Sequence, residues 1–418
     1  MFRKLFTSEI KTSFFQSSIL ISGTFLAQVV TILAYPILTR LFSVSEFGGL
    51  SLFLSITSII SIFVTARMEY ALILPKYDSE AEEIFKIGVY WCFICSILCL
   101  CISLIIGLLN FGHKIPGLYL ISFTGLTTGL LQLLTFRKNR QKNYKAIARV
   151  SVIQNFFSTG FKLLDGFFSL LNPGLIIGNL IGLSVATLTI YDKSLKTIFL
   201  KRGIDWKILN KYSGFPKYRL PQALLNSFST SLPIFFLTIY YSYKEAGYFS
   251  IIFGIALNLV NMVSSSLYQV LYQKITSYYH ENLNIYSFYK RIIIILFIIA
   301  FIPACIGFTF SKEVVILYFG KAWINSAVYL RIIIPWLFLV FIISPFSFIA
   351  DIFSYQKKTF WIDITSLILR LSGLYIGYFF NNALISIFLY ALGSLCIQIY
   401  LFFWYRWILL NIYNTELK

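Results

Sequence analysis

Apolar runs of about eighteen or more residues recur along the whole chain, and they constrain the fold more than any other feature. Each run is long enough to cross roughly 30 Å of hydrocarbon as an α-helix. Only 12% of the residues are charged, and the mean hydropathy is +0.79. A soluble protein carries about a quarter charged residues. The sequence therefore predicts an all-α, polytopic membrane protein.

The apolar runs predict twelve transmembrane helices. They are continuously apolar and do not alternate with a period of two, so they are not typical of barrel strands. The predicted spans are residues 16–38, 48–66, 87–109, 117–136, 150–170, 174–191, 220–241, 246–272, 292–310, 325–349, 359–380 and 382–405.

The distribution of Lys and Arg predicts the orientation. With the N-terminus in the cytoplasm, 27 of the 35 Lys and Arg fall in the inside segments and five in the outside loops. The positive-inside rule favours this arrangement, in which both termini are cytoplasmic. The net charge of +19 is then mostly a cytoplasmic fringe attracted to anionic membrane lipids, and it does not require a nucleic-acid partner.

One segment of the first half is repeated, with substitutions, 199 positions later. The two stretches are "TRLFSVSEFGGLSLFLSI" (39–56) and "TIYYSYKEAGYFSIIFGI" (238–255). The identical pairs are Thr39 and Thr238, Ser43 and Ser242, Glu46 and Glu245, Gly48 and Gly247, Ser51 and Ser250, and Ile56 and Ile255. Each stretch is the predicted loop between the first two spans of one half. Because each half has an even number of spans, both copies have the same orientation, which defines a parallel repeat.

A polar stretch divides the two halves. Residues 192–219 hold eight Lys and Arg and two Asp. We therefore predict an N-terminal six-helix lobe over 1–191, a cytoplasmic linker over 192–219 and a C-terminal six-helix lobe over 220–418. Part of the linker is expected to lie flat on the membrane surface, because four apolar residues recur at helical spacing. They are Ile204, Ile208, Leu209 and Tyr212.

The two-lobe organisation favours transport. Two similar bundles joined by a linker can rock about a shared cleft, although a duplication without moving parts would leave the same pattern. The longest predicted outside loop runs only from Ser311 to about Ile324, which leaves little room for the catalytic groups of a polysaccharide polymerase. The sequence also lacks a phosphate-binding glycine loop, a nucleophile elbow and a metal-binding helix pair. We expect neither an enzyme nor a cofactor.

Three smaller features of the sequence receive structural interpretations. The cysteines of the third span are interpreted as small apolar fillers between helices; they are Cys92, Cys95, Cys99 and Cys101. The histidines, His113 and His280, fall in loops on opposite sides of the membrane and are not expected to share a site. Ser79 and Glu82 have the spacing of a capping box, which is expected to start the third helix.

Two windows of the chain resemble a known family. Residues 33–86 contain "ILAYPILTRLFSVSEFGGLSLFLSITSIISIF" and "RMEYALILPKYDSEAEEIFKIG", and residues 213–276 contain "FPKYRLPQALLNSFSTSLPIFFLTIYYSYKEAGYFSIIFGI". These patterns resemble the first two spans and the seventh and eighth spans of bacterial polysaccharide flippases. Those proteins belong to the multidrug/oligosaccharidyl-lipid/polysaccharide exporter superfamily. In topology the resemblance covers nearly the whole chain.

The resemblance implies a MATE-like protein with two six-helix lobes around a central cavity. It implies a flippase of the bacterial cytoplasmic (inner) membrane that serves O-antigen, lipopolysaccharide or capsule biosynthesis. The cargo would be an undecaprenyl-diphosphate-linked oligosaccharide, moved to the outer leaflet by alternating access. A polysaccharide polymerase and a chain-length regulator are implied partners. Coupling to H+ or Na+ stays open.

Elementary energetics agree with a cationic passage for such a cargo. Moving one unpaired hydroxyl into hydrocarbon costs a few kcal/mol, and a short oligosaccharide carries many hydroxyls. The diphosphate is costlier still, so the path must be polar, wet and positively charged. A membrane potential that is negative inside gives roughly 2.3 kcal/mol per charge per 100 mV in favour of an anion that moves outward.

Five basic residues are candidate substrate contacts, because ionisable groups within spans usually face a cavity or a partner. They are Arg331, Arg370, Arg67, Lys162 and Arg40. Arg331 has no carboxylate within one helical turn, so we favour it as a diphosphate contact. Arg40 and Arg67 lie near span ends, where they could instead reach lipid head groups.

Three acidic residues are candidates for ion pairs or for coupling. Asp165 is three residues after Lys162, and the two could neutralise one another. Asp363 precedes Arg370 by a little under two turns, and Glu69 follows Arg67. A cation-coupled multidrug exporter is the alternative function, but it would prefer an acidic cavity, and the charges within the predicted spans are mostly basic.

Overall fold

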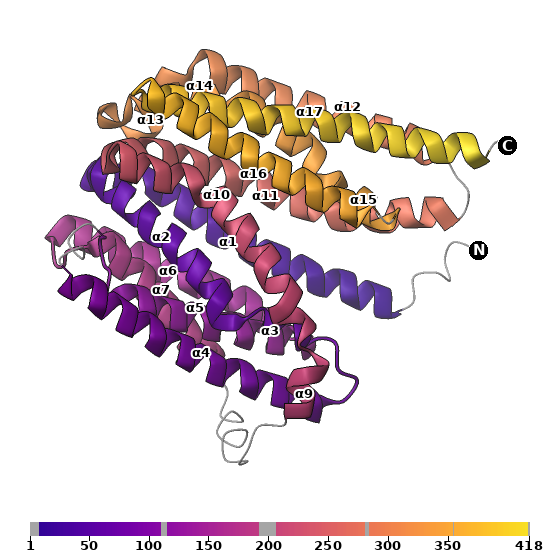
Figure 1. Cartoon of the computed structure of the whole chain (residues 1–418), viewed down its shortest axis with the longest axis horizontal. Coiled ribbons are helices and arrows are strands. Elements are labelled where there is room, and N and C mark those ends of the chain that lie inside the picture. Colours follow the sequence, from indigo (N-terminus) through magenta and orange to yellow (C-terminus); the bar gives the residue numbers. More distant parts are fainter. Residues whose placement is uncertain (1–7, 110–114, 192–205, 281–283, 354, 417–418) are drawn as a thin grey trace. The chain divides into compact units, whose positions relative to one another are not determined.

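The computed structural model describes residues 8–109, 115–191, 206–280, 284–353 and 355–416 (Figure 1). These residues form helices and their connections, and no strand occurs among them. The all-α prediction is confirmed. The chain divides into two compact units, Met1–Ser231 (unit 1) and Leu232–Lys418 (unit 2), which are described separately below.

Unit 1 begins with long helices that are joined by short turns. Its helices are α1 (Ser8–Leu41), α2 (Val44–Thr65), α3 (Met68–Ala71), α4 (Asp78–Leu108), α5 (Leu120–Arg140), α6 (Tyr144–Phe168), α7 (Gly174–Ile190), α9 (Trp206–Lys211) and the π-helix η2 (Phe215–Arg219). Helix α10 (Leu220–Tyr240) runs across the boundary between the units.

Unit 2 contains the remaining helices. They are α11 (Tyr243–His280), α12 (Ile285–Thr309), α13 (Ser311–Phe319), η3 (Lys321–Trp323), α14 (Ser326–Ile343), η4 (Ser344–Phe346), α15 (Ile349–Ile352), α16 (Gln356–Phe379) and α17 (Ala383–Glu416).

Eight helical segments of the described chain are long and apolar enough to cross a membrane. They are Val44–Thr65, Asp78–Leu108, Phe215–Tyr240, Tyr243–Ser264, Ile285–Thr309, Ser326–Ile352, Gln356–Phe379 and Ala383–Asn411. Helices α5 and α6 fall outside this set, and α7, with 17 residues, is among the shorter apolar helices. The predicted number of twelve spans and the predicted lobe boundaries therefore stay predictions.

Glycines let α7 approach α6 closely in unit 1. Gly174, Gly178 and Gly182 are spaced one per turn on α7. A Cβ atom on Gly182 would lie 2.5 Å from the carbonyl oxygen of Gln154 on α6, and one on Gly178 would lie 2.6 Å from Cγ of Lys162. Small residues at this spacing are typical of tightly packed membrane helices.

The second part of the linker packs on unit 1. Tyr212 is 9% exposed and belongs to an apolar cluster that includes Ile84 and Leu133, and Ile208 packs against the same cluster. The sequence led us to expect these residues on the membrane surface, but their apolar face is covered by protein. Ile204 lies outside the described residues, and so does the side chain of Leu209. The linker is thus attached to unit 1 at α9.

Candidate functional site

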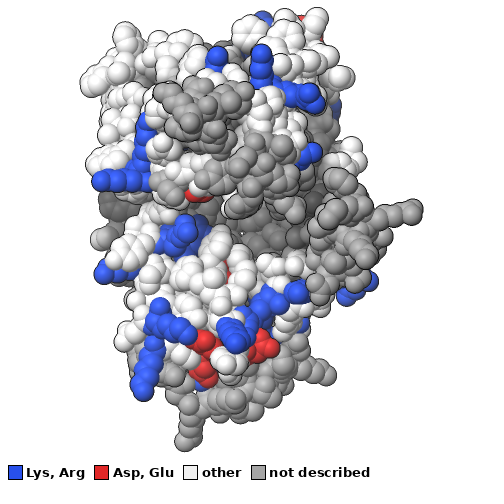
Figure 2. Space-filling model, turned by 90° about the vertical axis from the view of Figure 1, so that its right-hand side faces the viewer, with Lys and Arg blue, Asp and Glu red and all other residues white. Residues whose placement is uncertain are grey.

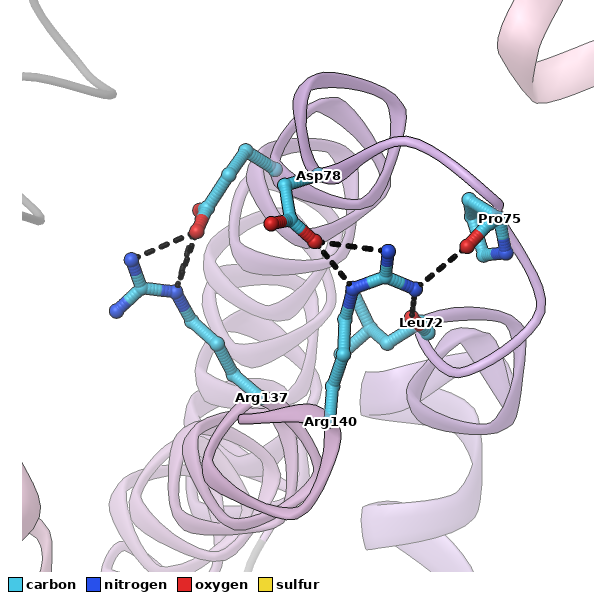
Figure 3. Close-up of polar contacts among 6 residues, drawn as sticks. Leu72, Pro75, Asp78, Arg137 and Arg140 are labelled. Carbon is cyan, nitrogen blue, oxygen red and sulfur yellow. Dashed lines mark hydrogen bonds and ion pairs between the residues drawn. The ribbon is translucent and has the colours of Figure 1, made fainter. Parts of the chain in front are cut away.

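Charged side chains gather at one end of unit 1, where α4 begins and α5 ends (Figure 3). Arg137 of α5 is 7% exposed, and its Nε and Nη2 atoms lie 2.9 and 2.7 Å from Oε1 of Glu82 on α4. The guanidinium of Arg137 also lies 5.4 Å from the centre of the Phe85 ring. This geometry is a charge-assisted pair that joins two helices.

Glu82 therefore does not form the predicted capping box with Ser79. Helix α4 begins at Asp78, and the residue before it, Tyr77, makes no side-chain capping bond. Ser79 already lies within the first turn. The prediction was wrong because Arg137, which is distant in sequence, binds the carboxylate that the helix start would use.

Arg140 anchors the segment that precedes α4. Its Nη1 atom donates to the carbonyl oxygens of Leu72 (3.1 Å) and Pro75 (2.8 Å), and its Nη2 atom lies 2.8 Å from Oδ1 of Asp78 (Figure 3). Asp78 is almost fully exposed. The planar guanidinium thus connects α5 to the chain after α3 by hydrogen bonds in several directions.

Arg67 and Glu69 meet where α2 ends. Ala66 (φ 48°) and Arg67 (φ 60°) are both in the left-handed region, which stops the helix without a glycine. Nη1 of Arg67 lies 3.4 Å from Oε1 of Glu69, whose side chain is 1% exposed. Oε2 of Glu69 has no hydrogen-bond partner in the described chain. Burial raises the pKa of Glu69, against the opposing effects of the hydrogen bond from Thr65 and the charge of Arg67.

Arg331 binds the end of a neighbouring helix. Its Nε and Nη2 atoms donate to the carbonyl oxygens of Phe308 (3.2 Å) and Thr309 (3.4 Å), the last two residues of α12. These carbonyls have no partner within α12, and a cation stabilises the negative end of the helix dipole. Part of this guanidinium therefore has a structural partner.

Arg370 lies among side chains of unit 2. Its Nε atom donates to Oγ of Ser394 at 3.0 Å, and its guanidinium lies 5.7 Å from the ring centres of Trp336 and Tyr390. Asp363 is on the same helix, α16, and its side chain is exposed. Arg370 is thus placed against two aromatic faces, an arrangement that stabilises a cation in an apolar environment.

Lys162 and Asp165 do not pair with each other in the described structure. Asp165 is buried, and its Oδ1 atom accepts a hydrogen bond from the backbone N–H of Leu171 at 2.7 Å, which organises the turn between α6 and α7. The aliphatic stem of Lys162 packs against Gly178. Asp165 also lines a pocket of about 420 Å³ with Glu46 and Asn172.

Arg40 is exposed in the last turn of α1 and donates from Nη1 to the carbonyl oxygen of Pro36. Among the predicted site residues, the structure therefore brings Arg67 and Glu69 together. Arg40 and Arg331 contact carbonyls near helix ends, and Asp165 contacts a loop.

Comparisons with known proteins give the family. The family described as polysaccharide biosynthesis proteins matches residues 37–328, which is well over half of the chain. The chain belongs to this family. None of the curated proteins compared with the chain matches it significantly.

This polysaccharide biosynthesis protein shares its fold with two kinds of solved transporter. The lipid II flippase MurJ in an inward closed conformation aligns with a TM-score of 0.73 at 15% identity, over 96% of this chain and 91% of that chain. An inward-facing multidrug resistance MATE family transporter of the MOP superfamily aligns with a TM-score of 0.64 at 15% identity, over 96% of both chains. The MATE-like fold is confirmed.

Sequence reasoning missed the pairs made by Arg137 and Arg140 in this family member. Both residues were counted only as cytoplasmic charge. Their spacing of three on α5, and the spacing of four between Asp78 and Glu82 on α4, place each pair on one helical face. In the lower part of Figure 2, acidic side chains gather beside basic ones, whereas Lys and Arg are spread over the rest of that face.

Proposed function

We propose that the protein is a flippase for undecaprenyl-diphosphate-linked oligosaccharide repeat units of O-antigen or capsule. The observation that carries this proposal is the combination of family and fold. The chain belongs to the polysaccharide biosynthesis proteins and aligns with the lipid II flippase MurJ at a TM-score of 0.73. Lipid II is itself a lipid-linked saccharide, so the fold is one that handles this class of cargo.

The proposed mechanism is alternating access in the bacterial inner membrane, with both termini in the cytoplasm. Twelve helices in two six-helix lobes would enclose a wet, cationic passage, which replaces the hydration of the sugar hydroxyls and of the diphosphate. Among the predicted cations, Arg370 of unit 2 is the one that we propose for the diphosphate. Arg331 and Arg40 contact backbone carbonyls, so we do not place them in the passage.

A deletion strain tests the proposal. Cells that lack the flippase should accumulate single lipid-linked repeat units that face the cytoplasm, and the full-length chain should restore surface polysaccharide. Accumulation of single units on the outer face would instead identify a polymerase. Arg370→Gln should reduce surface polysaccharide while the amount of protein in the membrane is unchanged, and Lys321→Gln is a matched control because Lys321 is exposed in η3.

A second candidate function is cation-coupled export of small amphipathic drugs, which the likeness to a multidrug resistance MATE transporter favours. The two functions predict different phenotypes. Drug susceptibility that rises on deletion, with normal surface polysaccharide, would favour the exporter. Lost surface polysaccharide with unchanged drug susceptibility would favour the flippase.

A further inference from the structure

An apolar groove runs between α12 and α14 in unit 2. It has a volume of about 230 Å³ and is lined by Phe301, Ala304, Cys305 and Phe308 of α12 and by Ile334 and Phe338 of α14. The residues of α12 are spaced three or four apart, so they form one face of that helix. Both helices are candidate membrane spans.

The groove is open to the outer surface of the helix pair α12 and α14. Phe301 and Phe308 are each about half exposed, at 50% and 49%. Helix α12 is mostly exposed: only 6% of the residues in its most apolar stretch are buried. In a membrane such a surface faces hydrocarbon, so the groove is accessible to lipid chains.

The cationic side chain of Arg331 lies at one end of this groove. Arg331 precedes Ile334 and Phe338 by three and seven residues, which places it on the same face of α14. Its bonds to the carbonyl oxygens of Phe308 and Thr309 hold the guanidinium where α12 ends. Both of these residues also line the groove.

The guanidinium of Arg331 keeps capacity for an anion. Nε and Nη2 donate to carbonyls, whereas Nη1 makes no hydrogen bond within the described chain. No described carboxylate forms an ion pair with Arg331. A phosphate oxygen is the acceptor that best matches a guanidinium with a remaining N–H group.

We propose that the groove binds a single-chain polyprenyl phosphate lipid, with its hydrocarbon between α12 and α14 and its phosphate on Arg331. The choice of this lipid rests on the proposed function, in which the cargo is carried on a polyprenyl chain. Charge complementarity supports it, because an apolar groove with the guanidinium of Arg331 at its end matches a hydrocarbon chain that ends in an anionic group. In the predicted orientation the end of α12 faces the outer leaflet, so the site would hold the polyprenyl phosphate in that leaflet.

The first experiment measures binding of undecaprenyl phosphate to the purified full-length protein by native mass spectrometry. Arg331→Gln should weaken binding about tenfold or more, because one charge-assisted hydrogen bond is lost. Lys312→Gln is the matched control: Lys312 is an exposed residue at the start of α13, and its replacement should leave binding unchanged. Equal binding by wild type and Arg331→Gln would overturn the proposal.

The second experiment uses Cys305 as a reporter inside the groove. With the other five cysteines replaced by Ala, undecaprenyl phosphate should slow the reaction of Cys305 with N-ethylmaleimide several-fold. Ala304→Phe, which fills the groove, should abolish the protection. If phosphatidylglycerol protects Cys305 as well as undecaprenyl phosphate does, the groove is a general phospholipid site and the proposal is wrong.

These experiments distinguish failure of the groove proposal from failure of the proposed flippase function. If the wild-type chain restores surface polysaccharide to a deletion strain but undecaprenyl phosphate neither binds nor protects Cys305, only the groove proposal fails. If binding and protection are found but surface polysaccharide is not restored, the groove proposal holds and the flippase proposal fails.

Discussion

Helices α2 of unit 1 and α11 of unit 2 begin in the same way and end differently. At their starts, the backbone N–H of Glu46 donates to Oγ of Ser43 (3.4 Å), and that of Glu245 donates to Oγ of Ser242 (3.2 Å). Each serine caps its helix by accepting from the third residue after it. The echoed sequence therefore encodes a helix start that is used twice.

Hydrogen bonds on either side of the caps also correspond. Before the caps, the hydroxyl of Thr39 donates to the carbonyl oxygen of Tyr35 (2.9 Å), and the hydroxyl of Thr238 donates to that of Ile234 (2.8 Å). After the caps, the hydroxyl of Ser51 donates to the carbonyl oxygen of Gly48 (2.8 Å), and the hydroxyl of Ser250 donates to that of Gly247 (3.3 Å). All four donors and their acceptors keep the offset of 199. The repeat is thus preserved at the level of side-chain-to-backbone bonds, which depend on local sequence alone.

The two helices differ at their other ends. Helix α2 stops at Thr65, and Ala66 and Arg67 turn the chain toward α3, whereas α11 continues as a helix to His280. The carboxylates also differ. That of Glu46 accepts from N–H and Oγ of its own cap residue Ser43, and that of Glu245 accepts from the hydroxyl of Tyr329 on α14. Local sequence sets where these helices start, and tertiary partners determine the rest.

The largest expected effect comes from the residue that holds the segment after the break in α2. Arg140→Ala removes the bonds to the carbonyls of Leu72 and Pro75 and the pair with Asp78, so it should lower the free energy of unfolding by about 3 kcal/mol. Thermal unfolding in detergent, followed by tryptophan fluorescence, measures this loss. Lys145→Ala, an exposed control at the start of α6, should change stability by less than about 0.5 kcal/mol. A similar loss in both variants would show that Arg140 is not the anchor.

Tyr329→Phe should give the next largest effect, and it tests the difference between the two carboxylates. Tyr329 is fully buried, and its replacement leaves the carboxylate of Glu245 without this donor, which should cost about 2 kcal/mol. Glu46→Gln in unit 1 should cost about 1 kcal/mol or less, because its partners are exposed. Equal losses, measured by the same unfolding assay, would mean that the tertiary bond adds nothing to the local one.

The fold was predictable from the sequence where the residues of a single segment determine where a helix begins or ends. The last apolar run, 382–405, locates the start of α17 at Ala383 to within one residue, but the helix continues to Glu416, beyond the apolar part. The predicted span 48–66 also locates the end of α2 at Thr65 to within one residue, but the left-handed backbone of Ala66 and Arg67 gave no signal, because neither residue is glycine. Arg331 was expected to be available for cargo. Its partners are carbonyls of another helix, which no spacing on α14 can reveal.

Ser43→Ala and Ser242→Ala test the shared part of the comparison. Each should lower stability by about 1 kcal/mol, the usual effect of removing a capping hydroxyl. Because the two caps have the same geometry, the two losses should agree to within about 0.5 kcal/mol in the same detergent. A loss of stability in only one variant would show that the two repeated caps do not contribute equally to stability.

The smallest expected effect is a dependence of stability on pH. Glu69 of unit 1 should cause it, whereas Tyr268, which lies 199 positions later in unit 2, should not. Burial raises the pKa of Glu69 above its ordinary value of 4.5, so the folded state holds a proton that the unfolded state releases. Stability should therefore fall as the pH rises from about 4.5 through the raised pKa. Glu69→Gln removes this fall and should be more stable than wild type at neutral pH, whereas Tyr268→Phe should leave the slope unchanged. Parallel stability curves for wild type and Glu69→Gln between pH 4 and pH 8 would contradict a raised pKa for the buried carboxyl of Glu69.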